Sequence, residues 1–393
     1  MKIHFPLAEA VISNLHLIFE EGRYADRVIE HCFKKNKKWG ARDRRFIAEN
    51  TYDIVRNYRL LAECAGSKQP WMLLAAHWIK NGIQLPDWKE LNGINPSYIV
   101  NKLKDTELTF AIKESVPDWM CELGKVELPE IWETEMTALN KEAHVVLRTN
   151  TLKITRKKLQ EALLKEEIST FESDEMPEAL ILEKRQSVFS SQAFKNGFFE
   201  IQDIASQHVA QFTDIKPGQR VIDACAGGGG KSLHLAALMQ NKGKIISMDV
   251  EEWKLNELKR RAARAGVQNI ETRLIGSNTV QGQKNSADRL LLDVPCSGTG
   301  VLKRNPDAKW KLTPERIQEI KKTQAKILLD YSVMVKPGGK LIYATCSIFP
   351  SENQHQVKSF LQENPAFILE EEKTILPSAG FDGFYMSRLI KSE

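Results

Sequence analysis

The sequence lacks the features that mark several protein classes. None of its six cysteines stands in a C-x-x-C pair, so a zinc site is not expected. No apolar run approaches the length of a membrane span, and the stretch 71–79 is short and contains a histidine. Pro6 and Glu9 interrupt the N-terminal segment, which is not a signal-peptide pattern. We therefore predict a cytoplasmic protein with no metal, no membrane contact and no disulfide framework.

The charge is modest overall but unevenly distributed. The 393 residues suffice for two or three domains with a proper core, and their net charge is only +5. Seven basic residues against one acidic residue, Asp43, occupy the stretch 34–45. This stretch is either a solvated turn between helices or a surface that binds nucleic acid.

Two segments precede the part of the chain that carries chemistry. Residues 1–125 are predicted to be all helical, because apolar residues recur three and four positions apart in "AEAVISNLHLIFEEG" and "RRFIAENTYDIVRNYRLL". Residues 126–196 mix strand-like "HVVLRTNTLK" with a helix that Thr155 could cap, which indicates a small α+β unit. Arg148 and Lys153 in this unit are candidate RNA-binding residues.

Residues 197–393 are predicted to form a doubly wound α/β domain. Short apolar runs suited to a parallel sheet alternate with helical segments. These runs are "RVIDACA", "KIISMDV", "RLLLDVP" and "KLIYATC". The later "SENQ", 351–354, has the form of a helix capping box. In such a domain, ligands bind at the carboxyl ends of the strands.

The stretch "ACAGGGGKS", 224–232, predicts a glycine turn that admits a nucleoside. It is not a Walker loop, because Cys225 stands where the first glycine is required, and it does not fit G-x-G-x-x-G. Asp249 lies nineteen residues beyond Gly230, at the end of the second strand, where a carboxylate can bind a ribose diol. The loop residues Cys225, Ala226, Gly227, Gly228, Gly229, Gly230 and Lys231 are therefore candidate cofactor contacts. A purely structural turn remains the alternative.

Two cysteines follow the ends of later strands. Asp293 and Cys296 come just past one strand in "LLDVPCSGTG", and Cys346 comes just past the next in "YATCSIFPSEN". Two thiols beside an acid and a nucleoside site indicate attack on an electron-poor ring. A thiolate that adds to carbon 6 of a pyrimidine makes carbon 5 nucleophilic, while the acid exchanges a proton at N3. Lys231, Lys303 and Arg304 could supply the positive potential that lowers the pKa of such a thiol.

These motifs resemble those of the RsmB-type RNA cytosine carbon-5 methyltransferases, the group that includes the Nop and NSUN proteins. The shared stretches are "ACAGGGGKS", "DVPCSGTG", "PDAKW" at 306–310, "YATCS", "PSEN" and "DGFYMSRL" at 382–389. The resemblance covers the chain from about residue 128 onward. It implies a Rossmann-like fold dependent on S-adenosylmethionine, with Cys346 as nucleophile, Cys296 in product release and Asp293 as the acid of the same motif. Gln202 and Asp203 would line the site.

The N-terminal "ARDRRFIAENTYDIVRNYRLL" looks like the NusB-like domain of bacterial ribosomal members. It favours ribosomal RNA, with 16S rRNA as the expected partner of a monomeric enzyme, and Arg148, Lys153, Lys303 and Arg304 as the expected RNA contacts. The chain departs from the family pattern after its third strand, where "LIGSN" offers Ser277 or Asn278 in place of the usual acid beside adenine. Either Phe349 or Trp310 could stack on the flipped cytosine, and either could equally be a core residue.

Other functions remain open at this point. They are a transfer RNA cytosine-5 methyltransferase, a DNA cytosine methyltransferase, an amino-group methyltransferase, and a catalytically silent RNA-binding factor in ribosome assembly. The second thiol speaks against the DNA enzyme, and "DVPCSG" lacks the paired prolines of the amino-group enzymes. Activity would separate the enzyme from the silent factor.

Overall fold

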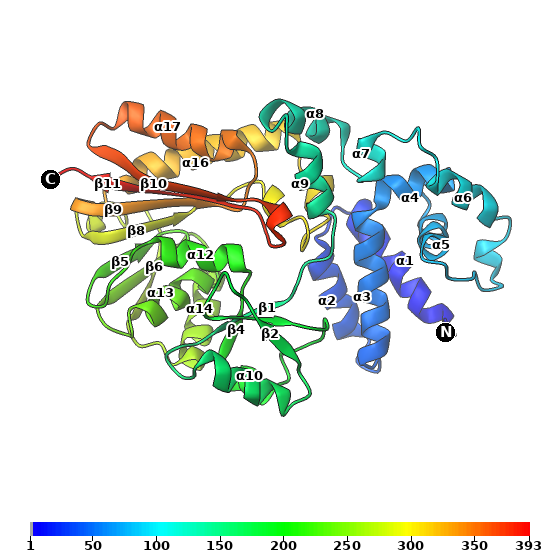
Figure 1. The fold of residues 1–393 in the computed structure, drawn as a ribbon, viewed down its shortest axis with the longest axis horizontal. Coiled ribbons are helices and arrows are strands. Elements are labelled where there is room, and N and C mark those ends of the chain that lie inside the picture. The colour runs from blue at the N-terminus through cyan, green and yellow to red at the C-terminus, as the bar shows by residue number, and fades with distance from the viewer. Residues whose placement is uncertain (1–2) are drawn as a thin grey trace. The chain divides into compact units, whose positions relative to one another are not determined.

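The computed structural model describes residues 3–393, which form two compact units (Figure 1). The helical unit runs to Lys141 and also contains Leu302–Pro314. The α/β unit comprises Glu142–Val301 and Glu315–Glu393. The chain therefore leaves the α/β unit once, after Val301, and returns to it at Glu315.

The helical unit is built on apolar residues at helix spacing, as predicted. For example, α1 buries Val11, Leu15 and Ile18 in one common core with Ile47 and Ile54 of α3. Its helices are α1 (Phe5–Phe19), α2 (Ala25–Lys35), α3 (Ala41–Arg56), α4 (Tyr58–Ala65), α5 (Pro70–Lys80), α6 (Pro96–Leu103), α7 (Phe110–Lys113), α8 (Asp118–Glu127) and α9 (Trp132–Leu139). A short helix, α15 (Ala308–Lys311), comes from the inserted segment.

The inserted segment 302–314 is an integral part of the helical unit. Asp307 accepts a hydrogen bond from the backbone N–H of Ala25 at 3.0 Å. The buried ammonium of Lys309 donates to the carbonyl of Arg56 at 2.8 Å. Trp310 donates from its indole nitrogen to the carbonyl of Val55, also at 2.8 Å. These buried polar groups are satisfied by partners in α2 and α3, so the segment is fixed to the helices around it.

A small antiparallel sheet opens the α/β unit. Its strand order is β2-β3-β1-β4, and all three pairings are antiparallel. The elements are β1 (Val146–Thr149), α10 (Arg156–Leu164), β2 (Thr170–Glu172), β3 (Ala179–Leu182), α11 (Gln192–Lys195) and β4 (Phe199–Ile201). Thr155 caps α10 by accepting from the N–H of Lys158, which confirms the cap predicted for this helix. Leu147, Leu159 and Leu180 share its core.

A mixed seven-stranded sheet follows, in the order β10-β11-β9-β8-β5-β6-β7. Its strands are β5 (Arg220–Asp223), β6 (Lys244–Asp249), β7 (Ile270–Leu274), β8 (Ala287–Asp293), β9 (Val335–Thr345), β10 (Phe367–Ile375) and β11 (Phe384–Lys391). Strands β5 to β9 pair in parallel, whereas β11 runs antiparallel to both β9 and β10. The four apolar runs predicted as strands are β5, β6, β8 and β9, so the Rossmann-like fold is confirmed.

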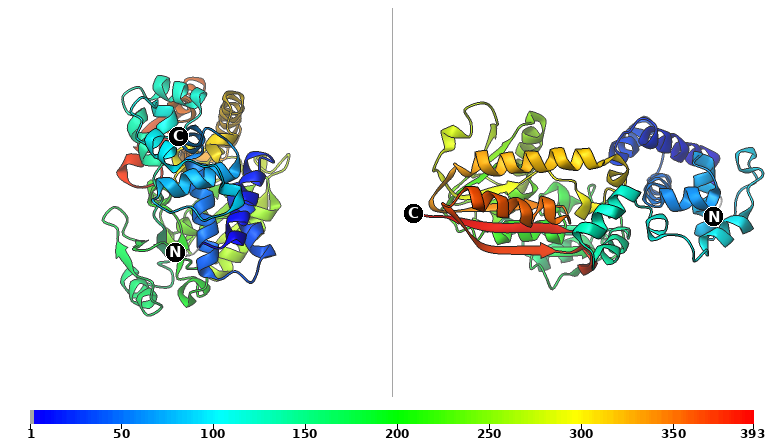
Figure 2. Two further views of the ribbon diagram at one scale, coloured as in Figure 1. Left: turned by 90° about the vertical axis from the view of Figure 1, so that its right-hand side faces the viewer. Right: turned by 90° about the horizontal axis from the view of Figure 1, so that it is seen from above.

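Helices cover both faces of this sheet (Figure 1). They are α12 (Ile204–Phe212), α13 (Gly230–Leu238), α14 (Glu252–Ala265), α16 (Pro314–Ser332) and α17 (Gln354–Glu363). One core joins Leu328 of α16 and Phe360 of α17 to the strands, and another joins Val209 of α12 and Leu235 of α13 to the opposite face. Figure 2, which views the protein from other directions, also shows α16 and α17 lying along the sheet. Both sheet faces are therefore buried, which explains the continuous apolar runs.

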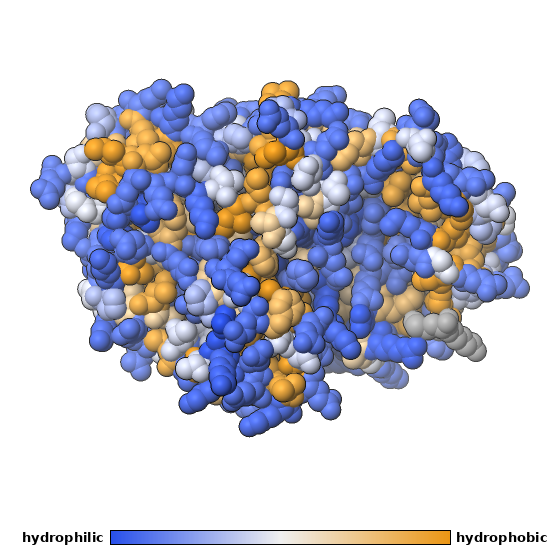
Figure 3. Space-filling view, viewed as in Figure 1, coloured by the Kyte–Doolittle hydropathy of each residue, from blue (hydrophilic) through white to orange (hydrophobic). Residues whose placement is uncertain are grey.

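The surface is mostly polar on the face shown in Figure 3, where apolar residues form separate patches. Among residues 3–393, no helix is long and apolar enough to cross a bilayer. The same residues hold no group of three or more metal-ligating side chains placed to bind an ion.

Candidate active site

Three acidic residues and two cysteines lie at or just past one edge of the large sheet. Strands β5, β6, β8 and β9 are parallel neighbours, and their last residues are Asp223, Asp249, Asp293 and Thr345. Since the carboxyl ends of parallel strands lie at the same edge, the loops that follow them converge there. Cys346 directly follows β9, and Cys296 lies three residues after β8.

The glycine loop after β5 adopts a conformation that only glycine accepts easily. Gly227 and Gly229 have φ of 52° and 85°, in the left-handed region. A Cβ at Gly229 would also lie 2.4 Å from Leu258 Cγ of α14. Helix α13 begins at the next residue, Gly230. The close approach of α14 therefore explains the glycine at 229, and the left-handed backbone explains the one at 227.

Asp249 is bonded directly to the glycine loop. Its Oδ2 accepts from the N–H of Gly227 and its Oδ1 from the N–H of Glu251, each at 2.9 Å. Two loop residues predicted to touch the cofactor are less open: Ala226 is buried and Cys225 half-buried. Burial, together with the nearby carboxylates, raises the pKa of the Cys225 thiol well above its ordinary value. Cys225 is therefore a neutral side chain at neutral pH.

Arg148 is bonded to the glycine loop and is buried. The prediction that it contacts RNA is therefore wrong. Arg148 is only 3% exposed, and its Nη1 donates to the carbonyl of Gly230 at 2.7 Å and to the side chain of Gln202. Burial lowers the pKa of Arg148 to about 10, so it stays charged at neutral pH. The Arg148 guanidinium is charged, but it is buried and bonded to the protein, so it cannot contact RNA.

A second arginine holds the same loop from α14. Arg261 donates to the carbonyl of Gly228 at 2.7 Å and forms an ion pair with Glu200 at 2.9 Å. Glu200 of β4 is the cross-strand partner of Arg148 in β1. The small sheet and the glycine loop are thus joined through two neighbouring strand positions. Sequence patterns gave no sign of this link, because the contacts lie far apart along the chain.

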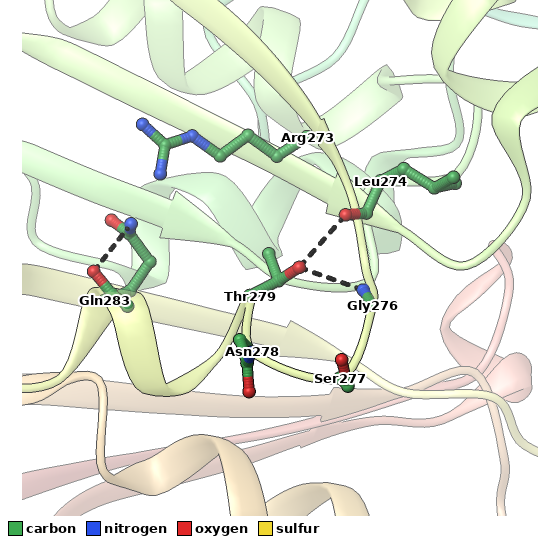
Figure 4. A pocket seen from close by; sticks show the side chains of 8 residues that line it. Arg273, Leu274, Gly276, Ser277, Asn278, Thr279 and Gln283 are labelled. Atoms are coloured by element: carbon green, nitrogen blue, oxygen red, sulfur yellow. Dashed lines mark hydrogen bonds between the residues drawn. The ribbon is translucent and has the colours of Figure 1, made fainter.

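The loop after β7 borders a pocket of about 590 Å³ (Figure 4). Thr279 shapes this loop: its hydroxyl accepts from the N–H of Gly276 at 2.9 Å and donates to the carbonyl of Leu274 at 3.2 Å. Ser277 and Asn278 are both exposed and both line the pocket. The pocket is next to Asp249 in the sheet order, because β7 pairs with β6. Leu274, which also lines the pocket, is the strand partner of Asp249.

The two cysteine sulfurs lie 3.3 Å apart. The hydrogen bond to Cys346 and burial raise the pKa of Cys296 well above its ordinary value, so Cys296 keeps its proton. The two sulfurs are within hydrogen-bond distance, and either thiol can be the donor of this contact. The prediction that these residues meet at one site agrees with this geometry.

Lys231 and Asp293 form a close ion pair beside the thiols. The ammonium and carboxylate are 2.5 Å apart, and the ammonium lies 5.1 Å from the ring centre of Phe384. Burial alone would lower the pKa of Lys231, but the charges of Asp293 and Cys346 outweigh it and raise this pKa. Lys231 is therefore firmly cationic and supplies positive potential at the sulfur site.

A second carboxylate near this pair is partly neutral. Burial raises the pKa of Asp223 to about 7, a hydrogen bond from Ser232 opposes the shift, and the charge of Asp293 adds to it. The donated hydrogen bond from Ser232 measures 2.6 Å. A protonated Asp223 leaves Asp293 as the main anionic partner of Lys231.

The other candidate RNA-binding residues occupy different places. Lys303 is 5% exposed and lies in the inserted segment of the helical unit, so its predicted contact is also corrected. Lys153 is exposed, but its ammonium donates to the carbonyls of Asn196 and Arg264 at 2.8 and 2.7 Å. Arg304 is partly exposed, in the same inserted segment as Lys303.

Neither aromatic residue considered for base stacking is placed to stack. Trp310 packs edge-on against Tyr58, with ring centres 5.3 Å apart, and its indole nitrogen is bonded within the helical unit. Phe349 is fully buried. Phe349 is thus a core residue, and the half-buried Trp310 packs against the core of the helical unit. Gln202 and Asp203, expected to line the site, are buried as well: Gln202 binds Arg148, and Asp203 caps α12.

Comparisons with known proteins identify relatives of both parts of the α/β unit. Residues 210–390 match the family described as 16S rRNA methyltransferase RsmB/F, and residues 116–189 match the ferredoxin-like domain of RsmF/B-like proteins. The chain is 31% identical to a probable ribosomal RNA small subunit methyltransferase B of Synechocystis, over 94% of this chain and 96% of the relative.

Two further comparisons agree with this match. The chain is 34% identical to the ribosomal RNA small subunit methyltransferase B of Vibrio vulnificus, over 70% of this chain and 66% of the relative. The fold is similar to that of the crystal structure of PH0851, with a TM-score of 0.83, 25% identity and full coverage of both chains.

Proposed function

The chain belongs to the RsmB/F family of 16S rRNA methyltransferases, and from this premise we propose that it methylates carbon 5 of a cytosine in 16S rRNA through a transient bond from Cys346. Membership makes the chain an RNA methyltransferase that depends on S-adenosylmethionine. The observation that carries the finer proposal is the pair of sulfurs 3.3 Å apart beside the Lys231–Asp293 ion pair.

Carbon 5 of cytosine needs activation before it can take a methyl group. It is a weak nucleophile until a thiolate adds to carbon 6, which turns carbon 5 into an enamine-like centre. Cys346 stands in the "YATCS" motif, whose cysteine the family resemblance makes the nucleophile, so we assign the attack to it. Lys231 places a positive charge near the Cys346 sulfur.

The Lys231–Asp293 pair and Cys296 assist the addition and release steps. The Lys231 ammonium donates to Asp293, and this pair relays one proton to N3 as the ring accepts electron density. After methylation, a base takes the proton of carbon 5 and the carbon–sulfur bond breaks. N3 returns its proton to the Lys231–Asp293 pair, and Cys346 leaves carbon 6 as the thiolate that attacked. The Cys296 S–H can hydrogen-bond this departing sulfur while keeping its proton. The ring thus exchanges one proton for a methyl group, and both cysteines return to their starting states.

The residues of the strand ends fit S-adenosylmethionine. Asp249 offers carboxylate oxygens for ribose hydroxyls, the open glycine turn admits a close ligand, and Ser277 and Asn278 line the adjoining pocket. When bound, S-adenosylmethionine supplies an electrophilic methyl group. Since the cytosine must present carbon 6 to a sulfur at a sheet edge, it must be unpaired or flipped out of its helix.

The basic stretch 34–45 is proposed to bind RNA phosphates. It joins the end of α2 to the start of α3, and most of its basic side chains are exposed. Two of these charges are already paired: Lys34 with Glu30 and Arg45 with Glu49, both at 2.6 Å. Lys35, Lys37, Lys38 and Arg42 are exposed and are the proposed contacts.

Asp249→Ala is expected to weaken binding of S-adenosylmethionine by about 10- to 100-fold, since a hydrogen bond to a charged group contributes about 1.5–3 kcal/mol. The substitution also leaves the N–H of Gly227 without its acceptor. Isothermal titration calorimetry measures the effect, with Asp330→Ala on the exposed side of α16 as control. Equal affinities for Asp249→Ala and the wild type would remove Asp249 from the cofactor site.

Arg148→Met is expected to weaken binding of S-adenosylmethionine about tenfold, because the carbonyl of Gly230 loses a charged donor and the glycine loop loosens. RNA affinity, measured by filter binding, should not change. Lys157→Met, an exposed basic residue on α10, is the matched control and should leave cofactor affinity intact. Loss of RNA affinity with normal cofactor binding in Arg148→Met would restore the original RNA-binding interpretation.

The proposed reaction is tested by bisulfite sequencing of total RNA from a strain with and without this gene. We expect one cytosine in 16S rRNA to lose its resistance to conversion when the gene is deleted. A lost signal in transfer RNA instead would identify a different substrate, and an unchanged pattern in all RNA would contradict carbon-5 methylation.

A further inference from the structure

Glu352 is a fully buried carboxylate with four hydrogen-bond donors. It ends the short turn Pro350–Glu352 that follows β9 and is 0% exposed. Its Oε1 accepts from the hydroxyls of Ser297 and Ser347 at 2.5 and 2.6 Å. Its Oε2 accepts from the N–H of Ser297 at 2.8 Å and from the amide of Gln324 at 3.0 Å.

The partners of Glu352 are the immediate neighbours of the two thiols. Ser297 follows Cys296, and Ser347 follows Cys346. One carboxylate is therefore bonded to both cysteine loops, and the bond to Gln324 fixes it to α16. Nothing else in the mechanism above uses these contacts.

A backbone contact joins the same two loops. The N–H of Gly300 donates to the carbonyl of Cys346 at 2.9 Å. A Cβ at Gly300 would lie 2.2 Å from the carbonyl oxygen of Gly383, so only glycine allows this approach. The two loops thus touch directly, and Glu352 holds the ends that carry the sulfurs.

The hydrogen bonds to Glu352 offset the energetic cost of burying its charge. An ionised carboxylate in the interior is costly unless its lone pairs are satisfied, and here four donors satisfy them. Because every contact of this carboxylate is internal, Glu352 has no access to a substrate. Its charge also raises the pKa of Cys296, after the larger effects of the Cys346 hydrogen bond and burial. These observations exclude a direct chemical step and point to control of geometry.

We propose that Glu352 is a positioning residue that sets the separation of the Cys296 and Cys346 sulfurs. Its catalytic meaning rests on the proposed function, because the attack on carbon 6 and the release step need the two sulfurs side by side. The separation itself is a property of the protein alone. A misplacement of about 1 Å in such a site reduces turnover by about 100-fold.

The separation is measured with phenylarsine oxide, without RNA or S-adenosylmethionine. The arsenic forms bonds to two thiols that lie close together and releases water, so one reagent reports the pair. The full-length wild type should bind one equivalent that requires both sulfurs, and Cys296→Ala should lose it. The other four cysteines remain in both proteins and serve as an internal background.

Two substitutions of Glu352 distinguish a change in the separation of the sulfurs from a general loss of folding. Glu352→Gln should retain capture of the arsenical, because the amide oxygen can accept from Ser297 N–H and Gln324 while its NH2 donates to the two hydroxyls. Glu352→Ala should lower the affinity at least about tenfold and kcat about 100-fold, with unchanged affinity for S-adenosylmethionine. Glu135→Ala, a 2% exposed glutamate in the helical unit, controls for general destabilisation.

Clear outcomes decide the proposal. Loss of capture and of kcat in Glu352→Ala, with recovery in Glu352→Gln, would support it. Wild-type capture and turnover in Glu352→Ala would overturn it. If that variant does not fold, Ser297→Ala/Ser347→Ala makes the same test by removing two donors. Full activity of Cys346→Ala would refute the proposed function, while the arsenical still reports on Glu352.

Discussion

Replacing Cys296 by alanine is expected to leave the protein covalently bonded to its RNA. In the proposed mechanism, a hydrogen bond from Cys296 to the Cys346 sulfur, 3.3 Å away, assists that sulfur as it leaves carbon 6. Without it, attack and methylation proceed but release slows by about 100- to 10,000-fold, the usual contribution of a positioned proton donor. A species that resists boiling in detergent should then accumulate on a denaturing gel.

Matched samples make this result specific. The band should require both RNA and S-adenosylmethionine, disappear on ribonuclease treatment, and be absent from Cys296→Ala/Cys346→Ala. Cys225→Ala removes a thiol of the glycine loop that is not part of the pair and should give no adduct. Normal multiple turnover by Cys296→Ala, with no stable adduct, would show that Cys296 has no part in release.

Replacing Cys346 by alanine is expected to abolish methyl transfer, with a loss on the order of 10⁴-fold or more in kcat. Without a sulfur to add to carbon 6, carbon 5 never becomes nucleophilic, and no neighbouring side chain can substitute. Cys296 lies 3.3 Å away but keeps its proton, so it is a poor replacement. Transfer of a labelled methyl group from S-adenosylmethionine to 16S rRNA measures the effect.

The binding properties of Cys346→Ala should remain normal. The glycine loop is held by Arg148, Arg261 and Asp249, none of which contacts Cys346. Calorimetry should therefore give the wild-type affinity for S-adenosylmethionine, which distinguishes lost chemistry from lost structure. Substantial residual turnover by this variant would contradict covalent catalysis.

The strand ends could be predicted because their signal is local. A buried parallel strand is a short apolar run, and four such runs each end in a residue suited to chemistry. Parallel pairing then places these ends at one edge without further information. Asp249, Asp293, Cys296 and Cys346 were found in this way, and the structure brings them to that edge.

Charged residues were less predictable, because a basic side chain looks the same in a sequence whether buried or exposed. Arg148 and Lys303 were expected at the surface and are almost fully buried. Lys303 lies in a segment that packs with helices about 250 positions earlier in the chain, as the bond from Arg56 to its carbonyl shows. Only long-range contacts reveal such placements.

The capping box predicted at 351–354 was wrong. Helix α17 begins at Gln354 after Asn353, and no side chain caps it. Glu352 instead turns inward to Ser297 and Ser347. The Ser and Gln pattern predicts a local cap, whereas the residue between them, Glu352, bonds to Ser297, 55 positions away in the sequence.

The last two strands were also missed. β10 carries four consecutive charged residues, Glu370–Lys373, and is exposed along nearly its whole length, so it shows no alternation of apolar and polar side chains. Its pairing with β11 is supported by ion pairs from Arg388 to Glu370 and Glu371.

Reaction of the wild-type protein with RNA that contains 5-fluorocytidine tests the central claim most directly. Fluorine at carbon 5 cannot leave as a proton does, so the ring stays bonded to the attacking sulfur after methylation. We predict a stoichiometric adduct in the presence of S-adenosylmethionine, and peptide mass spectrometry should place a methylated fluorocytidine on Cys346. Methylation of cytidine RNA without any adduct to the fluorinated RNA, or attachment at Cys296, would contradict the mechanism proposed here.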